Sequence, residues 1–283
     1  MKNELDQFYT KDEVALKLCE VVKAKLKDKI KDYTFLEPSA GGGAFVRAIN
    51  QSFENNEIIA LDLDPKAQNI KQCDFLTYDI NTPKIFTIGN PPFGKRADLA
   101  IRFFNHASIF SDYIAFIVPL QFEKWSVQKN LNKAFSLIYS QVLKPNSFIL
   151  NSKDYAVRCC FQIWTRLKTN IDLRLKQAPA TTHKDFEMWQ YNNTIEARKY
   201  FDKAKYAWDF AVVRQGFYDY KHFIIKEKEL NPKIQYIFFK ANNDKAMMNL
   251  KSLDFEMLSK KNTIVPGFGK ADVVAMYKRM FNE

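Results

Sequence analysis

Lys84-Ile85-Phe86-Thr87-Ile88-Gly89-Asn90-Pro91-Pro92-Phe93-Gly94 is the stretch of sequence that decides the fold. Lys84 to Ile88 form an apolar run that predicts a short buried strand. Two consecutive prolines lack backbone donors, so sheet pairing must stop and a rigid loop must begin at Asn90. Ligands in an open parallel sheet bind just beyond the carboxyl ends of its strands. Asn90 and an exposed Phe93 ring are therefore expected where chemistry occurs, and a structural loop with a buried Phe93 is the alternative.

Apolar, β-rich runs recur along the first part of the chain, mostly with helical or loop segments between them. They are Tyr33 to Leu36, Ile58 to Leu61, Ile85 to Ile88, Tyr113 to Val118 and Val157 to Trp164, and Phe135 to Leu143 could supply a further strand. Helical periodicity is present in Lys11 to Lys27, Leu99 to Phe110 and Glu123 to Leu131. Alternation of this kind predicts an α/β fold with a parallel sheet.

The first predicted helix, Lys11 to Lys27, is amphipathic, with lysines on the face opposite its apolar residues. Thr10 followed by Glu13 forms a capping-box signature at its start. Thr10 therefore has a structural reason to be present.

The pattern changes after Trp164 to a less regular mix of strands and helices, and we place a domain boundary near Lys168. Residues 1–168 then form one domain and residues 169–283 a smaller α+β domain. The second part contains a predicted strand from Ile234 to Phe239 and predicted helices from Asp244 to Leu258 and from Val273 to Met280. No internal repeat or low-complexity linker is evident, so we expect the two parts to pack together.

Composition narrows the class of protein. The chain has 283 residues, 47% hydrophobic and 27% charged, with no apolar run near the roughly 20 residues that cross a bilayer. We expect a cytoplasmic protein without membrane contact. Four cysteines show neither a disulfide framework nor metal-ligand spacing, and three scattered histidines argue against a zinc site or a histidine-based triad. A net charge of +11 favours a polyanionic partner such as nucleic acid.

A second glycine-rich turn lies upstream, in Leu36-Glu37-Pro38-Ser39-Ala40-Gly41-Gly42-Gly43-Ala44-Phe45. Three glycines permit a tight turn and close approach to a ligand, yet neither the dinucleotide pattern nor the triphosphate loop is present. Asp62 ends the next strand, where an acid commonly accepts from ribose hydroxyls, with Asp64 as its competitor. Glu37 would repel a pyrophosphate but suits a cationic amine. These residues point to S-adenosylmethionine.

Taken together, these segments resemble the adenine-N6 DNA methyltransferases in which cofactor motifs precede the catalytic motif and target recognition comes last. The resemblance covers about residues 6 to 164. It is carried by Asp6-Gln7-Phe8-Tyr9-Thr10, the loop from Glu37 to Phe45, Asp62, Cys73-Asp74-Phe75, Asn90 to Phe93, and the segment from Tyr155 to Trp164. It implies a Rossmann-like class I methyltransferase fold with a mainly parallel, seven-stranded sheet.

The resemblance also implies a role for each matching residue. Tyr9 and Thr10 would contact the carboxylate of the cofactor, while Glu37 and Gly41 would hold its methionine portion. The remaining cofactor contacts would come from Ser39, Phe45, Asp62 (ribose hydroxyls), Asp74 (adenine amine), Phe75 (adenine ring) and Asn90. Tyr155 occupies roughly the position where the family often stacks an aromatic side chain on the extruded base.

The chemistry follows from the acceptor. An aromatic amine is a poor nucleophile because its lone pair is delocalised, so acceptors for both of its protons are needed. The Asn90 amide oxygen and the Pro91 carbonyl, held by Pro92, can supply them. Phe93 stacked on the base would stabilise the positive charge that grows on nitrogen. A base within a duplex must first be flipped out.

Recognition of the target is the least specific part of the sequence. Arg214, Tyr218, Tyr220 and Lys221 bring basic and aromatic side chains close together, which suits phosphate and base contacts. A solvated face with buried aromatic residues explains the same pattern. DNA is the expected partner. The alternatives are amino-group methylation of adenine or guanine in RNA, glutamine methylation of a protein, and a non-catalytic nucleic-acid-binding subunit.

Overall fold

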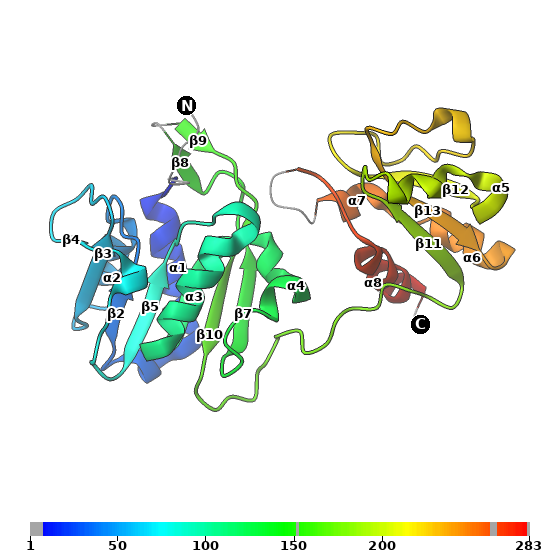
Figure 1. The fold of residues 1–283 in the computed structure, drawn as a ribbon. Helices are drawn as coiled ribbons and strands as arrows, with labels where there is room; N and C mark the ends of the chain where they lie inside the picture. The colour runs from blue at the N-terminus through cyan, green and yellow to red at the C-terminus, as the bar shows by residue number, and fades with distance from the viewer. Residues whose placement is uncertain (1–7, 151–152, 261–264, 282–283) are drawn as a thin grey trace. The chain divides into compact units, whose positions relative to one another are not determined.

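The computed structural model describes residues 8–150, 153–260 and 265–281. Its contacts divide the chain into two units, Met1–Lys176 and Gln177–Glu283 (Figure 1). Each unit is described by itself. Asp6 and Gln7, which belong to the first segment of the resemblance, lie outside the described residues.

The first unit is built on a seven-stranded sheet with strand order β4-β3-β2-β5-β6-β10-β7. Its strands are β2 (Thr34–Glu37), β3 (Ile58–Asp62), β4 (Lys71–Gln72), β5 (Ile85–Gly89), β6 (Ser111–Pro119), β7 (Ser136–Val142) and β10 (Cys159–Thr165). Its helices are α1 (Asp12–Leu26), α2 (Ala44–Ser52), α3 (Asp98–Phe110) and α4 (Trp125–Gln128). Neighbouring strands from β4 to β6 pair in parallel, whereas β10 is antiparallel to both β6 and β7.

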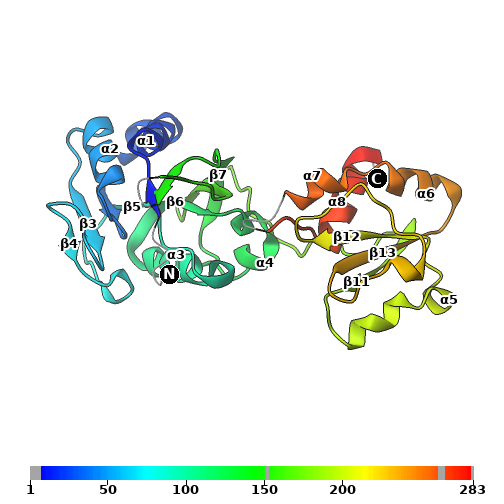
Figure 2. The same cartoon turned by 90° about the horizontal axis from the view of Figure 1, so that it is seen from above.

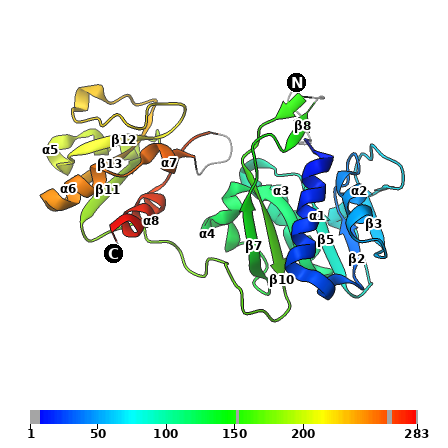
Figure 3. The ribbon, with the colours of Figure 1, turned by 180° about the vertical axis from the view of Figure 1, so that it is seen from behind.

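Helices cover both faces of this sheet, with α1 and α2 on one face and α3 on the other (Figures 2 and 3). Alternate residues of each strand face opposite sides. In β2, Phe35 joins the core under α1 and α2, and Leu36 joins the core under α3. Because strands buried on both faces consist of continuous apolar residues, the sequence locates these strands well.

The start of α1 differs from the prediction. The residue before the helix is Lys11, and no side chain caps the first turn. Thr10 instead belongs to β1 (Tyr9–Thr10), where it pairs with Phe148 of β8. The capping box expected from Thr10 and Glu13 is therefore wrong, because strand pairing holds Thr10 one residue too early.

β1 is part of a second, smaller sheet in the first unit. It pairs antiparallel with β8 (Phe148–Leu150), which pairs with β9 (Lys153–Tyr155). These strands have two or three residues each, too few to show a sequence period. The region predicted as a helix from Glu123 to Leu131 contains the end of a 3-10 helix (Leu120–Glu123), the four residues of α4 and turns.

The segment that follows β10 belongs to the first unit through Arg174. Its guanidinium donates to four main-chain carbonyls, those of Gln128, Leu131, Asn132 and Phe135. The Leu173 N–H also donates to the Leu137 carbonyl at 2.8 Å. These bonds explain why the first unit extends to Lys176.

The second unit is an α+β structure built on a three-stranded antiparallel sheet of order β11-β13-β12. Its strands are β11 (Phe186–Tyr191), β12 (Phe210–Gln215) and β13 (Gln235–Ala241), and its helices are α5 (Lys203–Tyr206), α6 (Asp244–Lys251), α7 (Phe255–Ser259) and α8 (Lys270–Phe281). The single helix expected from Asp244 to Leu258 is wrong. The first helix ends at Lys251, and Asp254 caps α7 by accepting from the Met257 N–H at 2.8 Å.

Two chemical features of the described chain bear on function. All four cysteines are free thiols, and Cys19, Cys159 and Cys160 are buried. Burial raises the pKa of Cys159 to about 12, so this thiol is not a nucleophile at neutral pH. No helix within the described ranges is long and apolar enough to span a membrane.

Candidate active site

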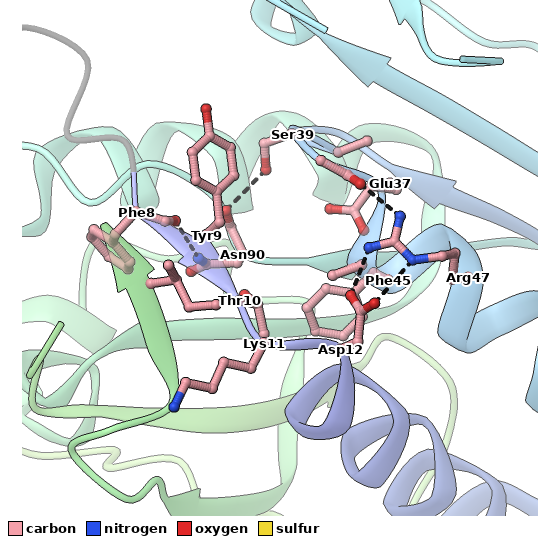
Figure 4. A pocket seen from close by; sticks show the side chains of 14 residues that line it. Phe8, Tyr9, Thr10, Lys11, Asp12, Glu37, Ser39, Phe45, Arg47 and Asn90 are labelled. Carbon is pink, nitrogen blue, oxygen red and sulfur yellow. Dashed lines mark hydrogen bonds and ion pairs between the residues drawn. The ribbon is translucent and has the colours of Figure 1, made fainter. Parts of the chain in front are cut away.

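Two adjoining cavities lie at the carboxyl ends of β2, β3 and β5. The first, of about 450 Å³, contains Thr10, Glu37 and Phe45 in its wall (Figure 4). The second, of about 540 Å³, is bordered by Asp62 and Asp74. Both cavities share Phe8, Tyr9, Ser39 and Asn90 as lining residues. The structure thus brings the two predicted loops and the two predicted acids together around one site.

Glu37 ends β2 and is only 1% exposed. Its Oε2 atom is buried and has no hydrogen-bond partner among the described residues. Burial raises the pKa of its carboxyl well above the usual value, the nearby Asp62 raises it further, and the Asn90 backbone N–H opposes both. A Cβ on Gly89 would lie 2.1 Å from Glu37 Oε1, so only glycine fits there. Such a carboxylate suits a ligand that brings a positive charge.

Asn90 follows β5 and presents a similar feature. Its Oδ1 atom is buried without a partner in the described part of the chain. The Nδ2 group faces the Phe8 carbonyl at 3.5 Å, and the Ser39 hydroxyl donates to the Asn90 carbonyl at 3.0 Å. Ser39, predicted as a cofactor contact, therefore orients the loop. A buried acceptor without a donor costs about 1–3 kcal/mol, which a ligand amine would offset.

The prediction of an exposed Phe93 ring is wrong. Phe93 is 7% exposed and belongs to the core under α1. Its ring meets Phe8 edge to face, with centroids 5.0 Å apart. Phe8 in turn contacts Phe148 and Tyr155. Phe93 is covered because β1 brings Phe8 against it, a contact between segments too distant in sequence to anticipate.

Gly41 and Asp62 form the joint between the glycine loop and β3. The Gly41 N–H donates to Asp62 Oδ2 at 2.7 Å, and the Asp64 N–H donates to Asp62 Oδ1 at 2.8 Å. Gly41 has φ +48°, and a Cβ there would lie 2.9 Å from the Tyr9 ring. Asp64 pairs with Lys66 at 2.6 Å. Asp62 is therefore the acid held in place by backbone donors, while Asp64 is committed to a surface ion pair.

Asp74 borders the second cavity and is exposed. Its Oδ1 accepts from the Leu76 N–H at 2.9 Å, so Asp74 also caps the short turn that follows. Phe75 is 1% exposed, and its ring packs against Phe103 and His106. Any contact of Phe75 with a ligand must come from the small part of it that borders the cavity.

The cavities also contain lining residues that were not predicted, among them Lys11, Arg47, Phe8 and Leu63. Lys11 borders the first cavity and pairs with Asp154 at 2.7 Å. Arg47 closes the same cavity: it pairs with Asp12 at 2.6 Å and donates to the Gly42 carbonyl at 2.7 Å (Figure 4). Phe8 and the exposed Leu63 complete the walls. Phe8, Lys11 and Leu63 could have been found in the sequence because they lie close to Tyr9 or Asp62. Arg47 could not, because it reaches the cavity only through the position of helix α2.

Thr10, Phe45 and Tyr155 complete the predicted set in the first unit. Thr10 Oγ1 is buried without a partner among the described residues. Phe45 is buried at the start of α2, against the first cavity. Tyr155 ends β9, is 40% exposed and stands 5.8 Å from the Phe8 ring, centroid to centroid.

Arg214, Tyr218 and Lys221, predicted for target recognition, lie in the second unit. Their side chains differ in exposure and in the bonds they make within that unit. Arg214 donates to the Phe268 carbonyl at 3.1 Å and to the side chains of Asn192 and Gln235. Burial lowers the pKa of its guanidinium. These bonds give Arg214 a structural role, and its contact with phosphate stays a prediction. Tyr218 is partly exposed and Lys221 pairs with Glu256 at 3.3 Å, so their contacts with nucleic acid stay predictions.

No group of three or more histidine, cysteine or acidic residues that could hold a metal occurs within the described residues. The donors and acceptors of the site instead suit an organic cation with hydroxyl and amine groups. Glu37 offers a carboxylate to an ammonium group, and Asp62 and Asp74 offer oxygens to hydroxyl and amine donors. S-adenosylmethionine has all of these groups and no phosphate.

The strand order, with β10 alone antiparallel and the cavities at the carboxyl ends of β2, β3 and β5, is that of a Rossmann-like class I methyltransferase fold. No protein-family model matches the sequence, and no curated protein matches it.

Several solved structures are similar to part of this chain. One is a Listeria monocytogenes protein provisionally assigned as a class I S-adenosylmethionine-dependent methyltransferase (16% identity, TM-score 0.47, 62% of this chain and 65% of that chain). Another is a Pyrococcus horikoshii protein provisionally assigned as an RNA methyltransferase (18%, 0.45, 58% and 91%). A third is the methyltransferase subunit of a type I restriction-modification system from Streptococcus thermophilus (17%, 0.45, 58% and 46%). The chain spans less than two thirds of the first and third of these.

Proposed function

We propose that the protein transfers a methyl group from S-adenosylmethionine to the N6 amine of a flipped-out adenine in DNA. The observation that carries this proposal is a pair of buried acceptors, Asn90 Oδ1 and Glu37 Oε2, which have no partner among the described residues and lie at the ends of two paired strands. Bound cofactor supplies a methyl group on a sulfonium. Everything else must come from the residues of this chain.

The first cavity would hold the methionine portion of the cofactor. Glu37 would accept from its ammonium group, and the unpartnered Thr10 hydroxyl would donate to its carboxylate. Lys11 also borders this cavity, but its amine already pairs with Asp154. Asp62 and Asp74 would accept from the ribose hydroxyls and the adenine amine in the second cavity, with Leu63 and Phe75 beside the ring.

The amine of the target base would lie between Asn90 Oδ1 and the Pro91 carbonyl. Pro91 borders the second cavity, and no described residue donates a hydrogen bond to its carbonyl. Two acceptors orient the amine so that its lone pair points at the methyl group, and they stabilise positive charge as it develops on nitrogen. The proton that is then lost passes to solvent. No general base is required before transfer.

The base must leave its helix to reach this loop, because its amine is otherwise paired and stacked. Phe8 lines both cavities together with Asn90, and its ring contacts those of Phe93 and Tyr155. This aromatic group would offer a stacking surface. Tyr155 and Phe8 form the accessible part of this surface, and Phe93 supports them from the core.

Asn90→Ala tests the proposal. We expect the variant to keep cofactor affinity within about twofold and to lose at least about 10²-fold in kcat, since one preorganised polar contact is removed. Asn50→Ala is the matched control: Asn50 is an exposed α2 residue that lines neither cavity. Methyl transfer to DNA at the same rate by Asn90→Ala and Asn50→Ala would refute the role of Asn90.

A further inference from the structure

The turn that follows the Asn90 loop carries two exposed cations, Lys95 and Arg96. Arg96 (φ 58°) and Ala97 (φ 67°) both have left-handed backbone, which residues other than glycine rarely adopt. The neighbouring structure imposes this conformation. Ala97 is buried in the core under α3, and Gly94 lies so close to Leu99 that a Cβ would be 2.8 Å from Leu99 Cβ. The turn therefore holds the backbone of Lys95 and Arg96 rigidly beside the site.

A third cation, Arg102, lies on α3 and is also exposed. Lys95 and Arg102 border the second cavity together with Asn90 and Pro91. The cations of the first cavity are committed, because Lys11 pairs with Asp154 and Arg47 pairs with Asp12.

In contrast, Lys95, Arg96 and Arg102 have no hydrogen bond or ion pair from their side chains to any described residue. Their charge is therefore available to a ligand.

The cofactor does not need this charge. S-adenosylmethionine has one anionic group, its carboxylate, and the first cavity already provides the Thr10 hydroxyl for it. A flipped nucleotide differs, because its base enters the cavity while the phosphates on either side stay at the mouth. Lysine and arginine are the usual partners of those phosphates.

We propose that Lys95, Arg96 and Arg102 grip the backbone phosphates next to the flipped nucleotide and so set the strand in register with Asn90. This inference rests on the proposed function and adds to it the part of the first unit that binds the strand. The rigid turn matters because cations fixed in advance lose less freedom when the strand binds. Specificity for sequence is left to other residues, since phosphate contacts do not read bases.

The test measures equilibrium binding to a mixed-sequence DNA duplex and to one of its single strands at several salt concentrations. Lys95→Gln/Arg102→Gln leaves both left-handed residues, Arg96 and Ala97, unchanged. Arg96→Asn is added in a triple variant because asparagine tolerates left-handed backbone. The control is Lys17→Gln/Lys29→Gln/Lys133→Gln, which removes three exposed cations that border neither cavity.

Each lost phosphate contact should reduce the slope of log affinity against log salt by about 1. We therefore expect a reduction of about 2 for the double variant and about 3 for the triple variant, an unchanged slope for the control, and unchanged cofactor affinity in all. Equal slopes in the double variant, the control and the wild type would overturn the proposal, as would no measurable binding of either DNA form by the wild type. The proposed function fails separately, if the wild type binds DNA with this dependence yet transfers no methyl group to it.

Discussion

The cavity end of the first unit and the Arg214 cluster of the second unit both bury polar side chains, but they satisfy them differently. The Arg214 guanidinium donates to the Phe268 carbonyl and to the side-chain oxygens of Asn192 and Gln235. Of the four buried side-chain atoms without a partner in the described chain, three belong to Thr10, Glu37 and Asn90 at the cavities, and the fourth is Trp208 Nε1. A side chain with unsatisfied capacity indicates a ligand, whereas a satisfied one indicates structure.

The largest effect should come from Glu37→Gln. Loss of a charge-assisted hydrogen bond of about 1.5–3 kcal/mol predicts cofactor binding weaker by about 10- to 150-fold. The pH dependence should change as well. Because the pKa of Glu37 is raised, wild-type affinity should increase with pH up to that raised pKa, since binding requires the ionised form. Affinity of Glu37→Gln should be flat with pH. Calorimetric titration across pH measures both, and an identical pH profile in the two proteins would contradict this role.

The same substitution should have the opposite effect on stability. A carboxyl with a raised pKa binds more protons folded than unfolded, so ligand-free wild type should lose stability as pH rises from about 4.3 through the raised value. Glu37→Gln cannot ionise, so its thermal unfolding should lack this loss.

Arg214→Ala should act on stability alone. It leaves the Phe268 carbonyl and two side-chain acceptors without a donor, at a cost of about 2 kcal/mol or more in the second unit. Chemical unfolding measures this cost. Salt-dependent DNA binding should be unchanged below the transition. If Arg214→Ala had wild-type stability but a weaker salt dependence of DNA binding, Arg214 would be a phosphate contact and not a structural residue.

A smaller difference in stability is expected between substitutions of two adjacent glycines, Gly41 and Gly42. Gly41→Ala should lower stability by about 1–2 kcal/mol, because Gly41 has φ +48° and an added Cβ would lie 2.9 Å from the Tyr9 ring. Gly42→Ala should stay within about 0.5 kcal/mol, because nothing lies within 4 Å of its Cβ position. Unfolding curves of the two variants provide the check, and equal losses would show that the glycine loop is not constrained by Tyr9.

The sequence predicted the parts of the fold that depend on local pattern. Strands such as Ile85–Gly89 and Ser111–Pro119 are largely apolar runs. Glu37 and Asp62 end strands, and Asn90 follows one. It could not predict β1, because a two-residue strand exists only through its pairing with β8. That pairing explains two errors, the capping role of Thr10 and the exposure of Phe93.

Other errors have the same kind of cause. The pattern from Asp244 to Leu258 looks continuous, but Asp254 caps a new helix. Arg214 looked like a surface cation because its partners, Asn192, Gln235 and Phe268, come from separate parts of the chain. Lys95 and Arg96 were overlooked because only the strained backbone of the turn distinguishes them from other surface cations.

The most direct test of the central claim is the identity of the methylated product. Wild-type protein incubated with methyl-labelled S-adenosylmethionine and separate pools of DNA, RNA and protein should label DNA, and digestion should place the label in N6-methyladenine. Label confined to RNA or to protein would contradict DNA as the substrate, and label in DNA on a base other than adenine would contradict the assignment of the amine held by Asn90.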